Sequence, residues 1–179
     1  AAPVFQQPPR MPPSLPQMAS PPIVPVAPAM PPLPVSSLDQ VARTLRQLGE
    51  GGRRVTVIGS VRNAGTTYAA ITLARVLAKE SNVVLVDLAF GAPNLSVIST
   101  DPNAPGIAEL VRGTAGFGDI ITRDQFSQVH LVATGAVGVD GPALAASPML
   151  GTVIEALAQS YYHVVIDAGS AADVAVERF

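Results

Sequence analysis

The sequence predicts an α/β fold in which a mainly parallel sheet carries helices on both faces. Short apolar runs rich in β-branched residues, such as 55–58, alternate with stretches of helical periodicity. Two of these runs end in an aspartate, Asp87 and Asp167. A short loop with a glycine at each end, Gly59 and Gly65, joins the first run to the first long helical stretch. Strand, glycine loop and helix in this order are typical of parallel sheets.

The N-terminal segment differs from the rest of the chain in composition. Residues 1–34 hold 13 of the 18 prolines, and proline removes a backbone donor and fixes φ. We therefore predict a linker at 1–35, disordered or in the polyproline II conformation, followed by one domain at 36–179. The alternative is that this segment is a ligand for a proline-recognising domain.

The overall composition excludes several functional classes. Lysine and arginine total 11 against 13 acidic residues, a formal net charge of −2, whereas nucleic-acid binders usually show a basic excess. The chain has no cysteine and only two histidines, so disulfides and thiolate or histidine metal clusters are not expected. No apolar run approaches the roughly 20 residues of a membrane span, and no signal peptide is visible. This segment is expected to be cytosolic.

The domain is predicted to begin with a helix at 38–48, with Ser36 or Ser37 as its N-cap. Apolar residues spaced three and four apart predict one buried stripe. Its members are Leu38, Val41, Leu45 and Leu48. Arg43 and Arg46 lie off this stripe, three residues apart, and form either a solvated face or a contact surface for another subunit.

The remaining elements follow from the alternation of apolar runs and turn residues. Strands are predicted at 55–58 and 83–86, both buried on two faces, and at 129–133 and 164–166. Helices are predicted at 66–79, 106–112 and 147–160, with a further short helix near 117–121. Loops are expected at 93–95, 100–105 and 135–142.

The loop between Gly59 and Gly65 suits phosphate binding, because loop amides and a helix N-terminus together attract anions. Ligands of such sheets bind beyond the carboxyl ends of the strands, where Asp87 and Asp167 are also expected. Each aspartate alone could simply terminate a strand. Two of them together with the glycine loop favour a nucleotide-binding ancestry.

The loop departs from the phosphate-loop pattern G-x-x-x-x-G-K-[ST]. Five residues separate its glycines, and Thr66 stands where the lysine is expected. Thr67 is the natural Mg²⁺-ligating hydroxyl, and Asp167 is the expected acidic partner of the metal. Asp87 suits a second acidic role, such as orienting a nucleophile. Arg62 either replaces the missing cation or is an exposed loop arginine.

Together these features resemble the bacterial tyrosine kinase-like cytoplasmic domains of polysaccharide co-polymerases, over residues 38–170. The loop 59–67 is similar to the Walker A motif of that family, and VVLVDLAFGAPNL at 83–95 is similar to its second acidic box. PGIAELVRGTAGFGDII at 105–121 resembles the segment that follows this box. YYHVVIDAGS at 161–170 resembles the Walker B strand.

Several positions differ from the family pattern. Ala89 replaces the second aspartate of the acidic box, and the arginines after it are replaced by Gly91 and Ala92. Residues 168–170 are Ala-Gly-Ser in place of Thr-Pro-Pro. The family's oligomerisation motif E-x-x-R-x-x-R corresponds to Gln40, Arg43 and Arg46, with glutamine in place of glutamate.

The resemblance implies a P-loop NTPase-like fold that is truncated at its C-terminus, ATP or ADP with Mg²⁺ as cofactors, and a homo-oligomer. It also implies a membrane-anchored part of the same protein, the polysaccharide export machinery as partner, and a place on the cytoplasmic side of the bacterial inner membrane. The lost lysine and aspartate favour a pseudo-kinase. The alternatives are an active, divergent tyrosine kinase or ATPase, and a positioning ATPase of the ParA and MinD type.

Overall fold

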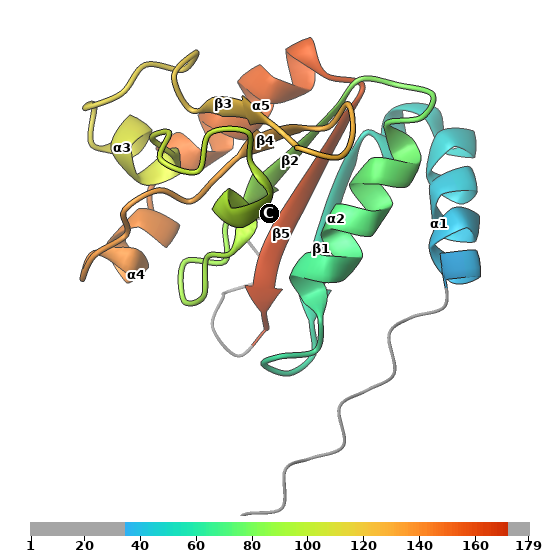
Figure 1. Cartoon of the computed structure of the whole chain (residues 1–179), viewed down its shortest axis with the longest axis horizontal. Helices are drawn as coiled ribbons and strands as arrows, with labels where there is room; N and C mark the ends of the chain where they lie inside the picture. The colour runs from blue at the N-terminus through green and yellow to red at the C-terminus, as the bar shows by residue number, and fades with distance from the viewer. Residues whose placement is uncertain (1–34, 172–179) are drawn as a thin grey trace, which may run out of the picture.

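A computed structural model describes residues 35–171, which fold into a five-stranded sheet between two helical layers (Figure 1). The helices are α1 (Val35–Gln47), α2 (Thr66–Leu77), α3 (Ile107–Val111), α4 (Gly141–Ala145) and α5 (Met149–Ser160), with 3₁₀ turns η1 (Gly49–Gly52) and η2 (Leu95–Ile98). The strands are β1 (Arg54–Gly59), β2 (Val83–Asp87), β3 (Ile121–Arg123), β4 (His130–Val132) and β5 (His163–Ser170). Their order is β1-β5-β2-β4-β3, and only β3 is antiparallel to its neighbour.

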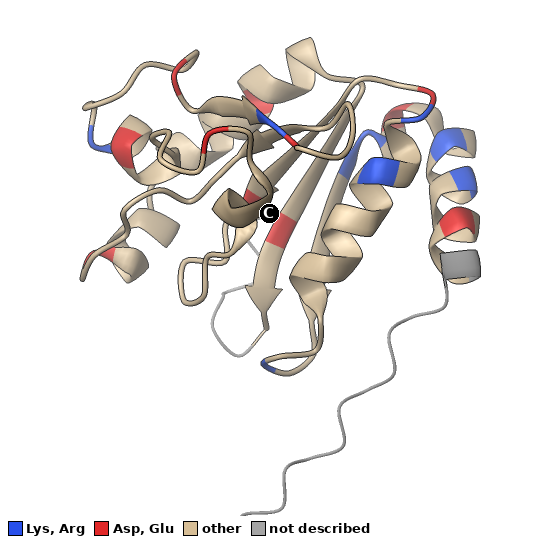
Figure 2. Cartoon of the chain, in the orientation of Figure 1, with Lys and Arg blue, Asp and Glu red and all other residues tan. Residues whose placement is uncertain are grey.

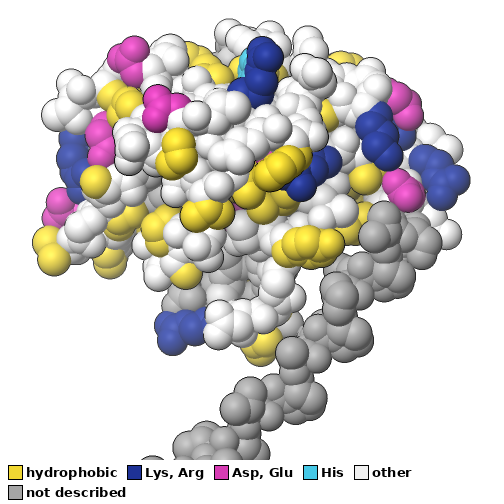
Figure 3. All heavy atoms as spheres, in the orientation of Figure 1, with side chains coloured by type: hydrophobic (Ala, Val, Ile, Leu, Met, Phe, Trp, Pro, Cys, Tyr) yellow, Lys and Arg dark blue, Asp and Glu magenta, His cyan; other side chains and the backbone are white. Residues whose placement is uncertain are grey.

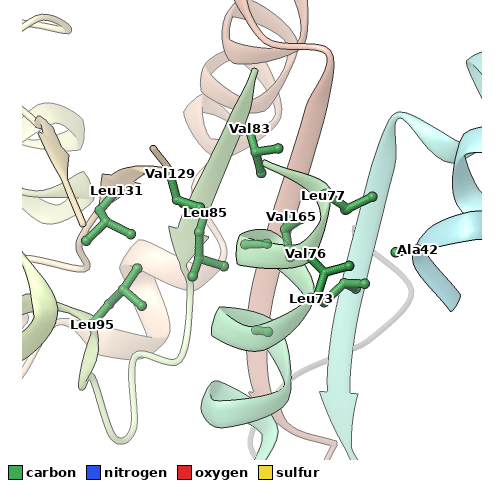
Figure 4. Close-up of a cluster of buried hydrophobic side chains, with 12 residues drawn as sticks. Ala42, Leu73, Val76, Leu77, Val83, Leu85, Leu95, Val129, Leu131 and Val165 are labelled. Atoms are coloured by element: carbon green, nitrogen blue, oxygen red, sulfur yellow. The ribbon is translucent and has the colours of Figure 1, made fainter. Parts of the chain in front are cut away.

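The predicted α/β class is confirmed, because each face of the sheet carries its own hydrophobic core. On one face, α2 packs on β2, β4 and β5 through residues such as Leu73, Leu85 and Val165, and Ala42 brings α1 against the same cluster (Figure 4). On the other face, α5 packs on alternate residues of the same strands, such as Val84 and Val164. A strand that supplies both cores must be apolar on both sides, as β2 is from Val83 to Val86.

The first strand is less buried than its composition predicts. Among the described residues β1 pairs only with β5 and ends the sheet. Val55 and Val57 pack against the α2 core, but the strand is only half-buried along most of its length. The prediction of a strand buried on both faces was therefore wrong for β1, because its apolar sequence says nothing about how many neighbouring strands it has.

The strand that carries Asp167 is longer than predicted. β5 continues past this residue to Ser170, and Figure 2 shows the acidic residue within the strand rather than at its end. The register with β1 shifts between Val57 and Gly59, so that β5 holds an extra residue there, and Gly169 has a φ of +68°. This bulge interrupts the ladder locally, and the pairing with β1 resumes at Ser170.

Two short elements after α3 differ from the prediction. The helix expected near 117–121 is absent: residues 114–119 form turns, and β3 begins at Ile121 as an antiparallel edge strand. The expected glycine-rich loop at 135–142 is shortened by α4, which begins at Gly141. The helix at 106–112 is confirmed as α3, and Gly113 follows it with a φ of +74°.

The first helix begins earlier than predicted and buries a different stripe. α1 starts at Val35, so Ser36 and Ser37 lie inside the helix and are not its N-caps. The buried residues are Leu38 and Ala42, whereas two members of the predicted stripe face solvent. These are Val41 and Leu48, which are 43% and 58% exposed. Because α2 covers only part of the circumference of α1, fewer residues of the predicted apolar stripe are buried than their spacing suggested.

The predicted proline-rich linker lies outside the described residues, as does the end of the predicted domain after 171. In the part of the chain that the structure describes, no helix has both the length and the apolar character that a membrane span needs.

Candidate functional site

The glycine loop and α2 form the turn that a phosphate loop needs. After Gly59 the chain reverses through Asn63 and Gly65, both in the left-handed region with φ of 59° and 79°. Gly65 is the N-cap of α2, and no side chain caps this helix end. The first amides of α2 therefore point toward the loop, where an anion would be favoured.

Thr66 occupies the space above the first glycine of this loop. A Cβ on Gly59 would lie 2.2 Å from the Thr66 hydroxyl oxygen, so glycine is required for this close approach. The threonine side chain is too short to extend along the loop as a lysine would. The loop therefore keeps its backbone geometry but has a neutral hydroxyl at the position of the expected cation.

A cavity of about 890 Å³ opens in front of this loop. One wall consists of the loop and the start of α2 and includes the predicted residues Arg62, Gly65, Thr66 and Thr67. The opposite wall consists of segments 89–94, 141–145 and 168–170, that is, residues after β2, in α4 and at the end of β5. The structure thus brings four of the predicted cofactor-binding residues together around one cavity, while Gly59 lies behind Thr66.

The two predicted aspartates lie side by side. Asp87 and Asp167 are directly paired across the parallel strands β2 and β5, and their residues are 1% and 0% exposed. Neither belongs to the residues that line the cavity. Parallel pairing places both side chains on the same face of the sheet, so the two carboxylates are neighbours.

The carboxylate of Asp87 is occupied by backbone amides. Its Oδ1 accepts a hydrogen bond from the amide of Ala89 at 2.9 Å, and its Oδ2 accepts bonds from the amides of Asn94 and Leu95 at 3.2 Å each. Burial raises the pKa of Asp87 above its ordinary value, the Ala89 bond opposes this, and the charge of Asp167 raises it further. Asp87 therefore holds the loop after β2 in place, and both of its oxygens are engaged.

Asp167 keeps one oxygen without a protein partner. Its Oδ1 accepts a bond from the amide of Gly169 at 3.0 Å, while its buried Oδ2 has none. A buried acceptor without a partner is costly unless a proton, a water or a cation satisfies it. Thr67 and Asp167 would thus be the residues to hold Mg²⁺. The described residues contain no cluster of three or more histidine, cysteine or acidic side chains that would form a metal site by themselves.

The part of the far wall that α4 forms was not identified from the sequence. Phe90, Pro142 and Ala145 line it, and α3 holds the segment that carries α4. Glu109 accepts a hydrogen bond from the amide of Ala136 at 3.0 Å, and Arg112 donates to the carbonyls of Ala136 and Val137 at 2.6 and 2.9 Å. Glutamate and arginine three apart in a short helix were the only signal in the sequence, and this spacing is common on helix surfaces.

The three residues of the predicted oligomerisation motif do not share one environment. Gln40 and Arg43 are exposed on α1. Arg46 instead turns toward α2, where it donates to the carbonyl of Val76 at 2.9 Å and pairs with Glu80 at 3.1 Å. It therefore stabilises the C-terminal end of α2, whose last carbonyls lack helical partners.

Comparisons with known proteins were made at the level of sequence and of structure. No protein-family model matches the chain. No curated protein sequence matches it either.

Solved structures do match. The BceF tyrosine kinase domain superposes with a TM-score of 0.65 at 21% identity over 74% of this chain and 54% of that one. The kinase domain of the Escherichia coli tyrosine kinase ETK gives 0.67 at 19% identity, over 74% and 53%. The septum site-determining protein MinD from Pyrococcus horikoshii, complexed with Mg-ADP, gives 0.56 at 26% identity, over 64% and 48%.

This chain spans about half the length of these three structures. The chain therefore has the P-loop NTPase-like fold of the bacterial tyrosine kinase domains.

Proposed function

We propose that this chain is a regulatory and interaction domain of an exopolysaccharide co-polymerase that has lost tyrosine phosphorylation. Its place would be the cytoplasmic side of the bacterial inner membrane, next to a membrane-anchored part of the same protein and to the polysaccharide export machinery. The fold shared with the BceF and ETK kinase domains supports this proposal, as do the motifs at 83–95 and 105–121.

The proposed loss of activity rests on one observation: the loop has the backbone geometry of a phosphate loop, but the lysine and the second aspartate of the family pattern are missing. Thr66 supplies no cation to a transferring phosphoryl group, whose transition state depends on electrostatic stabilisation. Ala89 supplies no second carboxylate, and Asp87 already accepts three backbone hydrogen bonds. ATP or ADP with Mg²⁺ would still meet the loop amides and Thr67 in the cavity, and a metal ion on Thr67 would also have to reach the buried free oxygen of Asp167.

Incubation of the purified chain with radiolabelled Mg-ATP is expected to give no phosphotyrosine above background. The reason is the absence of the lysine charge and of the second acidic residue. The ETK kinase domain, treated in parallel, serves as the positive control for labelling. Robust autophosphorylation of this chain would overturn the pseudo-kinase proposal.

The proposed homo-oligomer would use the exposed side of α1 with Gln40 and Arg43. Arg43→Ala is expected to lower the sedimentation coefficient of the assembly and to leave the free energy of unfolding unchanged. Arg46→Ala is expected to lower that free energy by about 1 kcal/mol, the contribution of a typical internal hydrogen bond. Analytical ultracentrifugation and urea unfolding of both variants test this division; an Arg43→Ala protein that sediments like the wild type would contradict it.

A positioning ATPase of the MinD type is the second candidate. It is favoured by the 26% identity to Pyrococcus horikoshii MinD, a protein complexed with Mg-ADP. The segment 105–121, which resembles the kinase family, argues for the first proposal. Polysaccharide polymerase and transferase genes beside the coding gene would support the co-polymerase role, whereas partition genes would support the ATPase.

An active, divergent enzyme is the third candidate. It predicts ATP turnover that Asp167→Asn abolishes, because this carboxylate has the free oxygen that could face a metal. No turnover by the wild type is the result expected from the pseudo-kinase proposal.

A further inference from the structure

The surface beside α2 carries an aromatic side chain that is exposed and yet fixed in place. Phe126 is 72% exposed, and the guanidinium carbon of Arg75 lies 5.4 Å from the centre of its ring. Arg75 is itself held by two hydrogen bonds of 2.8 Å to the two oxygens of Asp124, which is 3% exposed. A cation fixed in this way restrains the ring against which it packs.

The turn that presents Phe126 is fixed by further hydrogen bonds. Ser127 donates to Asp124 at 2.6 Å. The side-chain amide of Gln125 donates to the carbonyl of Ser99 at 2.7 Å, and the backbone amide of Gln125 donates to the carbonyl of Ile98 at 2.9 Å. A ring that is already restrained loses little entropy when a partner covers it, which is the property of a binding anchor.

Two more exposed hydrophobic side chains lie on the elements that hold this ring, α2 and η2. Tyr68, 59% exposed, precedes Arg75 by two turns of α2 and lies on the same side of that helix. Val97, 70% exposed, adjoins Ile98, to which the turn is bonded. Figure 3 shows hydrophobic side chains next to basic ones on this face of the molecule. We call Tyr68, Val97 and Phe126 the aromatic patch.

We propose that the aromatic patch is the docking surface for the proline-rich segment 1–34 of the same chain. That segment holds 13 prolines and a single charged residue, Arg10. Proline-rich segments bind exposed aromatic rings, against which the flat pyrrolidine faces pack at low entropic cost. The members of the patch are uncharged, and Arg75 is neutralised by Asp124, so an almost uncharged apolar segment suits this surface.

Segment 1–34 is long enough to reach the aromatic patch, and it joins the domain at α1, next to the helix that carries Tyr68. It ends where α1 begins, at Val35, and α1 packs directly against α2 (Figure 1). An extended polyproline II segment of this length would span roughly 100 Å at about 3.1 Å per residue. A domain of this size has a diameter of roughly 40 Å. The segment can therefore reach Tyr68 and Phe126 within one molecule.

Paramagnetic relaxation enhancement tests the proposal on the full chain. The sequence has no cysteine, so Ser20→Cys gives a single site for a nitroxide label. The amide signals of Tyr68, Val97 and Phe126 are expected to lose most of their intensity relative to a diamagnetic label. A control sample mixes isotope-labelled chains that carry no nitroxide with nitroxide-labelled chains that carry no isotope, so that only contact between two molecules can broaden a signal. In this sample the three amide signals are expected to keep their intensity.

Two matched variants separate the patch from general contact with the domain. Phe126→Ala and Tyr68→Ala are each expected to restore the amide signals of the remaining patch residues, while Phe117→Ala, in a turn elsewhere, leaves the broadening unchanged. Both patch residues are largely exposed, so the variants keep the fold and the wild-type amide spectrum. The proposal is overturned by unbroadened patch signals, by broadening that Phe126→Ala and Tyr68→Ala leave unchanged, or by broadening in the mixed sample, which would assign the surface to a second copy.

Discussion

Arg75→Ala is expected to lower the free energy of unfolding by about 2–3 kcal/mol at neutral pH. The substitution leaves the carboxylate of Asp124, whose side chain is 1% exposed, without its bidentate partner. Loss of one partner from a buried ion pair typically costs about 3–5 kcal/mol, and the lower figure reflects the 34% exposure of the Arg75 side chain. Urea unfolding measures the change, and Arg43→Ala on exposed α1 is the control.

The effect of Arg75→Ala should depend on pH. Burial alone would raise the pKa of Asp124, but the hydrogen bonds from Arg75 and Ser127 and the Arg75 charge outweigh it and lower the pKa. A lowered folded pKa means that the pair stabilises the protein above the unfolded pKa of about 3.9 and loses this effect as the pH falls through the folded value. The difference between variant and wild type should therefore shrink as the pH falls below about 4. An equal difference at acid and neutral pH would mean that Arg75 acts through packing.

Thr66→Lys is expected to tighten Mg-ATP binding without restoring kinase activity. The loop already has the left-handed turns at Asn63 and Gly65 and a free start of α2, so the new side chain would extend into the cavity that the loop lines. A charge-assisted contact in place of a neutral one contributes about 1–2 kcal/mol, roughly five- to thirtyfold in affinity. Phosphoryl transfer would still lack the carboxylate that Ala89 replaces.

Calorimetric titration of the wild type, Thr66→Lys and Thr66→Met measures this gain. The methionine variant has a similar side-chain length without a charge, so it separates charge from bulk. Equal affinity of all three proteins would mean that the loop does not bind phosphates and that the fold has kept only its scaffold.

The central strand β2 could be predicted from the sequence because burial on both faces leaves a continuous apolar run. The run at 83–86 is apolar at every position, and only a strand covered on both faces requires this. The β-branched run at 55–58 predicted the strand correctly but overstated its burial, because β1 has only one neighbour among the described strands. Local composition reports the environment that suits a strand, whereas pairing depends on segments far away in the chain.

The candidate site divides in the same way. The sequence by itself determined the loop, the start of α2 and the two aspartates, because glycine spacing and an aspartate after an apolar run are local properties. Only the tertiary structure decided that Asp87 is engaged by the amides of the loop after β2 while Asp167 keeps a free oxygen. Which hydrogen-bond donors reach a buried carboxylate depends on the path of the surrounding backbone, and residue types do not encode that path locally.

The buried and exposed faces of α1 also depended on distant parts of the chain. The spacing of α1 predicted an apolar stripe with Arg43 and Arg46 beside it, because helical geometry determines which side chains share a face. The position of α2 then decided that Val41 and Leu48 face solvent and that Arg46 turns inward to the carbonyl of Val76. Periodicity fixes which side chains share a face of a helix, but the direction of that face is set by the element that packs against it.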